Sequence, residues 1–224
     1  MGEAVRLTAR DGFKLGAYEV KPEGKPRGGL VVLQEIFGVN AHIRSVADGY
    51  AADGYHVIAP AIFDRAEPNS DLGYDKPDME KGVALRGKIP TAATLLDIEA
   101  TVAKLGISGK VGLVGYCWGG SLAWFSAARV SGLAATVGYY GGMIAANLGE
   151  TPRVPVMLHF GEKDGGIPLS DVEAIRKAAD PAMVQIFTYP AGHAFNRDGT
   201  PSFQDHCAML ARMRTVKFLQ QHVG

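Results

Sequence analysis

The segment VGLVGYCWGG, residues 111–120, carries the strongest structural signal in this chain. Its first half is an apolar run of the kind that forms a buried strand, and the run stops at Gly115. Cys117 follows two residues later, and Gly119 lies two residues beyond it. After residue 120, small and apolar residues return at helical spacing. The pattern therefore predicts a strand, a sharp turn that carries a cysteine, and a helix.

A strand, a turn with the pattern Gly-x-nucleophile-x-Gly and a helix form the nucleophile elbow of α/β-hydrolases, here with cysteine in the place of serine. Such a turn is strained, and side chains at Gly115 or Gly119 would collide with the neighbouring strand and helix. The turn would present Cys117 at a helix N-terminus, whose backbone N–H groups favour developing negative charge. The alternative is a buried structural cysteine, because a free cysteine often behaves as a small apolar residue.

Length and composition favour a single domain over residues 1–224. Lys and Arg total 23, as do Asp and Glu, so the formal net charge is zero. The overall charge therefore does not favour binding to nucleic acid or to an anionic membrane. Two cysteines, Cys117 and Cys207, give no disulfide framework and fit a cytoplasmic setting. Residues 1–12 are charged and lack the apolar core of a signal peptide. We expect a cytoplasmic monomer or weak oligomer with no nucleic-acid or membrane partner.

Two uncharged stretches, residues 111–128 and 130–149, are long enough to span a membrane. Repeated glycines interrupt both, and the first changes from strand-like to helix-like character midway. Strands that are buried on both faces of a parallel sheet also read as continuous apolar runs. We therefore interpret both stretches as buried parts of a globular fold.

Strands and helices alternate along most of the chain. Apolar runs and alternating patterns predict strands at residues 3–9, 13–20, 29–34, 55–59, 111–115, 133–140, 155–160 and 183–188. Helices are predicted at 41–53, 91–105, 169–179 and 203–222, besides the helix after the elbow. Residues 61–81 are polar and rich in Pro, Gly and Asp, so we expect a long loop there. The alternation predicts an α/β-hydrolase fold, a mostly parallel sheet with helices on both faces.

Four reactive residues follow predicted strands, at the sheet edge where ligands bind in such folds. Cys117, Asp164 and His193 occur in the order nucleophile, acid, histidine, which is the order of α/β-hydrolases. His193 would take the thiol proton, and Asp164 would orient the imidazole. Glu35 is the fourth, beyond an earlier strand.

Other interpretations of these residues remain open. Asp164 could be a plain turn residue with Glu162 as a rival acid, and His193 could be a solvated loop histidine. His159, inside an apolar strand, is interpreted as a core histidine. We interpret the remaining candidates as structural, namely Cys207, His42, His56, His206 and His222. The chain has no phosphate loop and no histidine spacing typical of a metal site, so we expect neither a metal nor a cofactor.

The chain resembles the dienelactone hydrolase (carboxymethylenebutenolidase) family over nearly its whole length. The matching segments are QEIFGVN at 34–40, GYCWGG at 115–120, YYG at 139–141, GEKD at 161–164 and GHAF at 192–195.

This resemblance implies a triad of Cys117, His193 and Asp164. It also implies an oxyanion hole made by the backbone N–H groups of Ile36 and Trp118. By the same likeness, Glu35 would touch the resting thiol and help to deprotonate it once substrate arrives.

The resemblance further implies a small-molecule substrate whose carboxylate is held by two basic residues. Arg197, four residues after His193, matches one of them. The second has no secure counterpart, and the candidates are Lys81, Arg65 and Arg86. Phe37 and Tyr139 are implied as further substrate-binding residues.

We therefore expect a hydrolase that cleaves a carboxylic ester or lactone through a thioester acyl-enzyme. The resemblance also implies a role in the degradation of aromatic compounds. An acyltransferase or thioesterase with the same nucleophile is an alternative, as is a non-catalytic ligand-binding protein with a hydrolase-like fold. Redox sensing through Cys117 is a weaker alternative, because no resolving cysteine lies nearby in the sequence.

Overall fold

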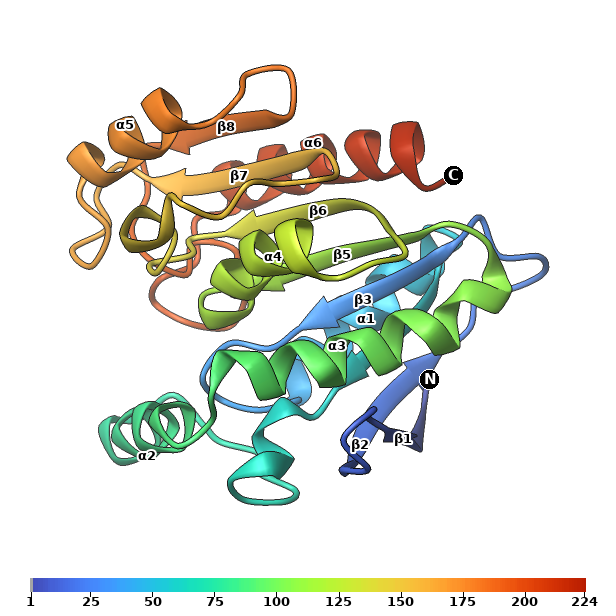
Figure 1. Ribbon diagram of the computed structural model, residues 1–224. Helices are drawn as coiled ribbons and strands as arrows, with labels where there is room; N and C mark the ends of the chain where they lie inside the picture. The colour runs from blue at the N-terminus through green and yellow to red at the C-terminus, as the bar shows by residue number, and fades with distance from the viewer. Residues whose placement is uncertain (1) are drawn as a thin grey trace.

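The computed structural model describes residues 2–224, so Met1 of the predicted domain lies outside the described part. Within that range the centre of the molecule is an eight-stranded sheet in the order β1-β2-β4-β3-β5-β6-β7-β8 (Figure 1). The strands β3 to β8 run parallel, whereas β2 pairs antiparallel with both β1 and β4. The strands are β1 (Glu3–Thr8), β2 (Lys14–Val20), β3 (Gly29–Leu33), β4 (His56–Pro60), β5 (Val111–Tyr116), β6 (Leu133–Tyr139), β7 (Val156–Gly161) and β8 (Val184–Tyr189). The predicted mostly parallel sheet is confirmed.

Helices cover both faces of this sheet, as predicted (Figure 1). On one face lie α3 (Thr91–Leu105) and α4 (Trp118–Arg129), and on the other lie α1 (Ala41–Ala52) and α6 (Asp205–His222). The helix α5 (Leu169–Ala178) connects β7 to β8. Short 3-10 turns occupy η1 (Ile62–Arg65), η2 (Gly106–Ser108) and η3 (Ala145–Asn147).

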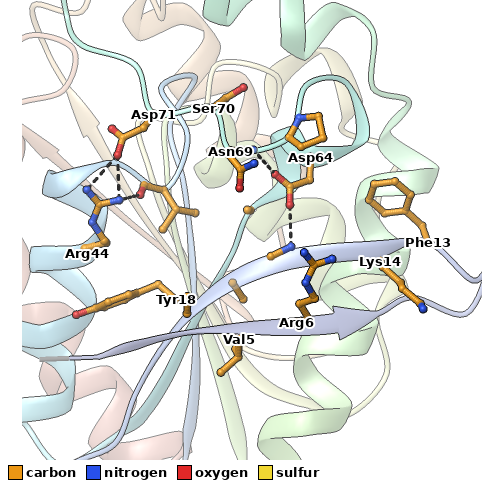
Figure 2. A pocket seen from close by; sticks show the side chains of 16 residues that line it. Val5, Arg6, Phe13, Lys14, Tyr18, Arg44, Asp64, Asn69, Ser70 and Asp71 are labelled. Carbon is orange, nitrogen blue, oxygen red and sulfur yellow. Dashed lines mark hydrogen bonds and ion pairs between the residues drawn. The ribbon is translucent and has the colours of Figure 1, made fainter.

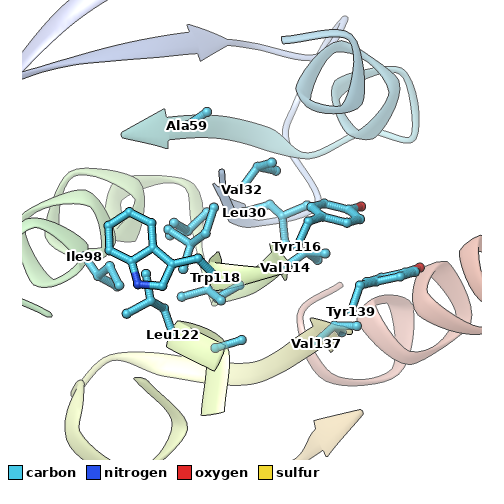
Figure 3. Close-up of a cluster of buried hydrophobic side chains, with 14 of the residues drawn as sticks. Leu30, Val32, Ala59, Ile98, Val114, Tyr116, Trp118, Leu122, Val137 and Tyr139 are labelled. Atoms are coloured by element: carbon cyan, nitrogen blue, oxygen red, sulfur yellow. The ribbon is translucent and has the colours of Figure 1, made fainter. Parts of the chain in front are cut away.

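The central strands are buried along their whole length, because helices pack on both sides of them. Every residue of β3, β4 and β5 is buried. Figure 3 shows Trp118 with Ile98 and Leu122 on one side of these strands, and Tyr116 and Tyr139 on the other. Two-sided burial explains the continuous apolar runs, because alternation appears only where one face of a strand meets water. Within residues 2–224, no helix is long and apolar enough to cross a membrane.

The segment 61–81 differs from the predicted long loop. Besides η1, it contains the start of α2 (Lys76–Gly87), which lies beyond the ends of the parallel strands (Figure 1). The Asp75 side chain caps this helix by accepting a hydrogen bond of 2.9 Å from the N–H of Asp78, and Pro77 occupies the first turn. Asp and Pro indicate a loop by composition, yet both are favoured at a helix N-terminus.

Candidate active site

Cys117 stands at the junction of β5 and α4 in a strained turn. Its φ is 54°, a left-handed conformation that residues other than glycine rarely adopt. A Cβ at Gly115 would overlap the carbonyl oxygen of Gly119, and a Cβ at Gly119 would lie 2.6 Å from that of Leu33. Strand and helix therefore approach this closely only because both positions lack a side chain. The turn leaves the thiol at the N-terminus of a twelve-residue helix.

The thiol, His193 and Asp164 form a chain of close contacts. Cys117 Sγ lies 3.2 Å from His193 Nε2, and His193 Nδ1 lies 2.7 Å from Asp164 Oδ2. Asp164 follows β7, and its other oxygen accepts a hydrogen bond of 2.9 Å from the N–H of Gly166. The Asp164 side chain is buried, whereas the rival acid Glu162 is exposed. The geometry therefore favours Asp164 over Glu162 as the partner of the imidazole.

The surroundings of His193 stabilise its protonated form. Burial alone would lower the pKa of His193. Hydrogen bonds to Asp164 and Cys117, together with the negative charges of these two groups, outweigh burial and raise the pKa to about 10. An imidazolium at neutral pH stabilises an adjacent thiolate. This arrangement can therefore hold a thiolate–imidazolium pair.

Two backbone N–H groups at the elbow are free to bind a ligand. Within residues 2–224, neither the N–H of Ile36 nor that of Trp118 donates to another residue. Trp118 is the first residue of α4, and Ile36 follows β3, the neighbour of β5 in the sheet. The N–H of Gly119 donates to the carbonyl of Gln34 at 3.1 Å, which ties the segment after β3 to the elbow. Unpaired N–H groups in this position can stabilise an oxyanion.

Glu35 faces Arg197 rather than the thiol. Arg197 Nη1 lies 3.3 Å from Glu35 Oε2, and the two side chains are only 11% and 2% exposed. The guanidinium carbon lies 4.3 Å from the centre of the Tyr74 ring and 5.3 Å from that of Phe37. Within residues 2–224, no hydrogen bond joins Glu35 to the resting thiol: the carboxylate pairs with a buried cation, and the thiol pairs with His193. Phe37 thus lies beside Arg197, and its role in substrate binding stays a prediction.

The three candidates for the second basic residue differ in their partners. Arg65 is held by two aspartates, and Lys81 by a glutamate oxygen at 2.6 Å. Arg86 has no acidic partner within residues 2–224, and its Nη2 lies 3.4 Å from the sulfur of Met143. Arg86 and Met143 line a cavity of about 280 Å³ together with Trp118. Arg86 is therefore the candidate whose charge is available beside the elbow.

The Tyr139 side chain points away from the site. Its ring is fully buried, and its hydroxyl lies 2.6 Å from Thr215 Oγ1 in α6. Successive side chains of a strand point to opposite faces, and Tyr139 takes the α6 face. Its carbonyl oxygen does reach the elbow, where it accepts a hydrogen bond of 2.9 Å from the N–H of Cys117. This placement corrects the expectation that the Tyr139 side chain binds substrate.

The site also contains two aromatic residues, Tyr140 and Tyr74, that the sequence patterns do not predict. The Tyr140 ring centre lies 5.0 Å from that of His193, and its buried hydroxyl has no partner within residues 2–224. Its position at the end of a predicted strand was an available signal, because the other reactive residues occupy such positions. Tyr74, which packs against Arg197, lies in the segment 61–81, where no sequence feature marks it.

A larger cavity of about 780 Å³ lies away from these residues (Figure 2). It opens between the β1–β2 hairpin and the segment 61–71. Its acidic groups are paired: Asp64 accepts hydrogen bonds from the N–H groups of Gly16 and Asn69, and Asp71 pairs with Arg44. None of the predicted catalytic residues lines this cavity, so it is distinct from the candidate active site.

The fold and the cysteine elbow together define an α/β-hydrolase. The model of the dienelactone hydrolase family matches residues 15–223, so the chain belongs to that family and is a carboxylic-ester hydrolase. It is 33% identical over 227 residues to a carboxymethylenebutenolidase of Pseudomonas putida. The aligned region covers 97% of this chain and 95% of that protein.

Solved structures agree with this assignment. A "putative dienelactone hydrolase" of Klebsiella pneumoniae superposes with a TM-score of 0.84 at 31% identity, over 99% of this chain and 100% of the other. A dienelactone hydrolase-like promiscuous phosphotriesterase from metagenomic libraries has a TM-score of 0.75 at 20% identity, over 100% and 99% of the two chains. The second likeness shows the fold alone. The predicted resemblance to the dienelactone hydrolase family is confirmed.

Proposed function

We propose that this hydrolase cleaves a carboxylic ester or lactone through a Cys117–His193–Asp164 triad and a thioester acyl-enzyme. The observation that carries the proposal is the contact of 3.2 Å between Cys117 Sγ and His193 Nε2, with Asp164 2.7 Å from the other ring nitrogen. A thiol at this position has its proton acceptor and the orienting acid close by.

The proposed reaction has two halves. The Cys117 thiolate attacks the ester carbonyl, and the N–H groups of Ile36 and Trp118 stabilise the resulting oxyanion. The C–O bond to the alcohol then breaks, and the leaving oxygen takes the proton from the His193 imidazolium. In the second half, neutral His193 takes a proton from water, the hydroxide attacks the thioester, and the thiolate leaves with the acid as product.

We further propose that the substrate carries a carboxylate, which displaces Glu35 from Arg197. A guanidinium holds a carboxylate through two parallel hydrogen bonds, and Arg197 packs over the rings of Phe37 and Tyr74, which contact each other. Arg86, in the cavity beside Trp118, is the proposed second cation. Replacing Arg86 by Ala should raise KM for an acidic ester, whereas Lys81→Ala serves as the matched control, because Lys81 already pairs with Glu67.

The Cys117→Ala variant tests the central claim. It should fold normally and lose turnover of an activated aryl ester, because it removes the nucleophile from a preformed turn. Wild-type protein should release a burst of phenol and carry a covalent acyl group on Cys117, detectable by intact-mass and peptide mass spectrometry. Retained turnover in Cys117→Ala, or acylation at another residue, would refute the proposed mechanism.

A further inference from the structure

Three buried polar atoms on residues of the candidate site lack a hydrogen-bond partner within residues 2–224. Within residues 2–224 six buried side-chain atoms are unpaired in this way, and Tyr140 Oη, Glu35 Oε1 and Arg197 Nε are among them. A buried polar group without a partner costs about 1–3 kcal/mol, so native proteins keep few of them. Three such atoms on residues of one site indicate hydrogen bonds that form only in another state of the enzyme.

Besides its unpaired hydroxyl, Tyr140 has an unfavourable backbone conformation. Four residues other than glycine within 2–224 have a positive φ, and Tyr140, at 40°, is one of them. Two of the others are Cys117 and Ala194, the latter directly after His193. Backbone strain of this kind costs about 1–3 kcal/mol per residue and gathers at functional sites.

The main chain and the aromatic core fix the Tyr140 ring. Its N–H donates to the carbonyl of His159 at 2.7 Å, and its ring meets that of Phe195 edge-on at 5.6 Å. The ring centre lies 5.0 Å from that of His193. Burial, followed by the charges of Glu35 and Cys117, raises the pKa of Tyr140 well above its ordinary value. The hydroxyl therefore stays protonated and remains a donor near the Glu35 carboxylate.

Glu35 needs such a donor when substrate is bound. Its carboxylate is 2% exposed, and its one hydrogen-bond partner within residues 2–224 is Arg197. If a substrate carboxylate takes Arg197, the charge on Glu35 is left buried and unpaired, which is strongly unfavourable. An acidic substrate would then bind weakly, however well it fits Arg197.

We propose that Tyr140 is a positioning residue for acidic substrates, whose hydroxyl donates a hydrogen bond to Glu35 while the substrate carboxylate occupies Arg197. This inference rests on the proposed function and deepens it. Tyr140 replaces Arg197 as the partner of Glu35, so the exchange leaves no buried charge unpaired. A neutral ester requires no exchange and gains nothing from the Tyr140 hydroxyl.

The Tyr140→Phe variant tests this role, because it removes only the hydroxyl. We expect the Kd for succinate, measured by titration calorimetry, to rise at least tenfold. KM for a 4-nitrophenyl half-ester of succinic acid should rise similarly, with kcat within threefold of the wild type. Turnover of 4-nitrophenyl acetate should fall at least fivefold less than kcat/KM for the half-ester, and the Tm should be equal or higher, because an unpaired polar atom is removed.

The matched control is Tyr116→Phe, which removes a buried tyrosine hydroxyl that lies 3.2 Å from the hydroxyl of Tyr50. This variant should leave the Kd for succinate unchanged. A double-mutant cycle adds a second test: in a Glu35→Gln background, Tyr140→Phe should change the Kd less than twofold, because no buried charge then needs a donor.

Three outcomes would overturn the inference. The first is an unchanged Kd for succinate in Tyr140→Phe, and the second is an equal loss of turnover on the acidic and the neutral ester. The third is an effect that persists in the Glu35→Gln background. If the wild type shows an Arg197-dependent preference for the acidic ester, these outcomes refute the role of Tyr140 alone. If the wild type shows no such preference, both the acidic-substrate proposal and this inference fail.

Discussion

Among single residues, His193 determines how the candidate site responds to pH. Its pKa rises from the ordinary 6.5 to about 10, because contacts with Asp164 and Cys117 outweigh burial. The pair with Asp164 is therefore fully stabilising below pH 6.5 and is lost as the pH rises through about 10. Between these limits the imidazolium persists in the folded protein and can stabilise the thiolate.

We predict that iodoacetamide alkylates Cys117 faster at pH 7 in the wild type than in His193→Gln, because an imidazolium stabilises an adjacent thiolate. The rate at pH 7 should fall severalfold in His193→Gln, because the cation beside the thiolate is then removed. Cys207 is buried, so intact-mass measurements should report a single modified site. Equal rates in the wild type and in His193→Gln at pH 7 would contradict the predicted ion pair.

The Glu35→Gln variant should affect binding at Arg197 but not the reactivity of Cys117. Alkylation of Cys117 should change little, because Glu35 contacts Arg197 and not the thiol. Succinate should bind more tightly, because the Arg197 charge is no longer neutralised. Stability should fall by about 3 kcal/mol, because a buried cation loses its anion. Urea unfolding and calorimetry on the same preparation measure both effects, and weaker succinate binding would count against Arg197 as the carboxylate site.

The sequence identifies the reactive residues better than their partners. Cys117, Asp164 and His193 could be found because each follows a strand, and the ends of parallel strands meet at one edge of a sheet. Their catalytic roles stay predictions. The pairing of Glu35 with Arg197 could not be found, because 162 residues separate them and only the folded loops bring them together.

Among the helices and strands, α2 is one that amino-acid composition alone does not predict. The helix has few apolar residues, and its buried positions are Gly82 and Leu85. A Cβ at Gly82 would overlap the carbonyl oxygen of Ile36, so α2 packs closely on the segment that carries a proposed oxyanion donor. The helix is stabilised by its N-cap and by this packing, and neither can be recognised from the hydrophobic periodicity of the sequence.

We predict that Asp75→Ala loosens α2 without unfolding the protein. Losing an N-cap costs about 1 kcal/mol, and here the cost falls on one exposed helix. Hydrogen exchange should accelerate at residues 76–87, and KM for an acidic ester should rise because Arg86 lies near the end of α2. Asp75→Ser, which keeps a capping oxygen, is the matched control. Unchanged exchange in Asp75→Ala would show that the cap contributes nothing.

In the molecule as a whole, a series of buried polar groups connects α6 to the strands of the sheet. Thr215 in α6 lies 2.6 Å from the Tyr139 hydroxyl and 3.1 Å from His159 Nε2. His159 Nδ1 lies 2.8 Å from the Tyr189 hydroxyl. Burial lowers the pKa of His159 to about 3, so this histidine is neutral, and its interpretation as a core residue is confirmed.

The alternation of strands and helices predicts the parallel sheet, because such connections must cross over the sheet to reach the next parallel strand. The order of the strands could not be predicted, nor could the contacts of α6 with β6 and β7. These contacts join residues such as Tyr139 and Thr215, which are 76 positions apart, and no local pattern records them.

The final prediction concerns this chain of buried groups. Thr215→Val keeps the shape of the side chain but leaves Tyr139 and His159 without a shared partner, which should cost about 1–3 kcal/mol of stability. Thr215→Ser keeps the hydroxyl and loses only a methyl group, so it should cost less than Val. Turnover of a neutral ester should change less than twofold in both variants, because Thr215 lies behind the sheet edge that carries the thiol. Urea unfolding ranks the two variants. If Val proves as stable as the wild type, the buried chain is not what holds α6 against the sheet, and apolar packing alone must do so.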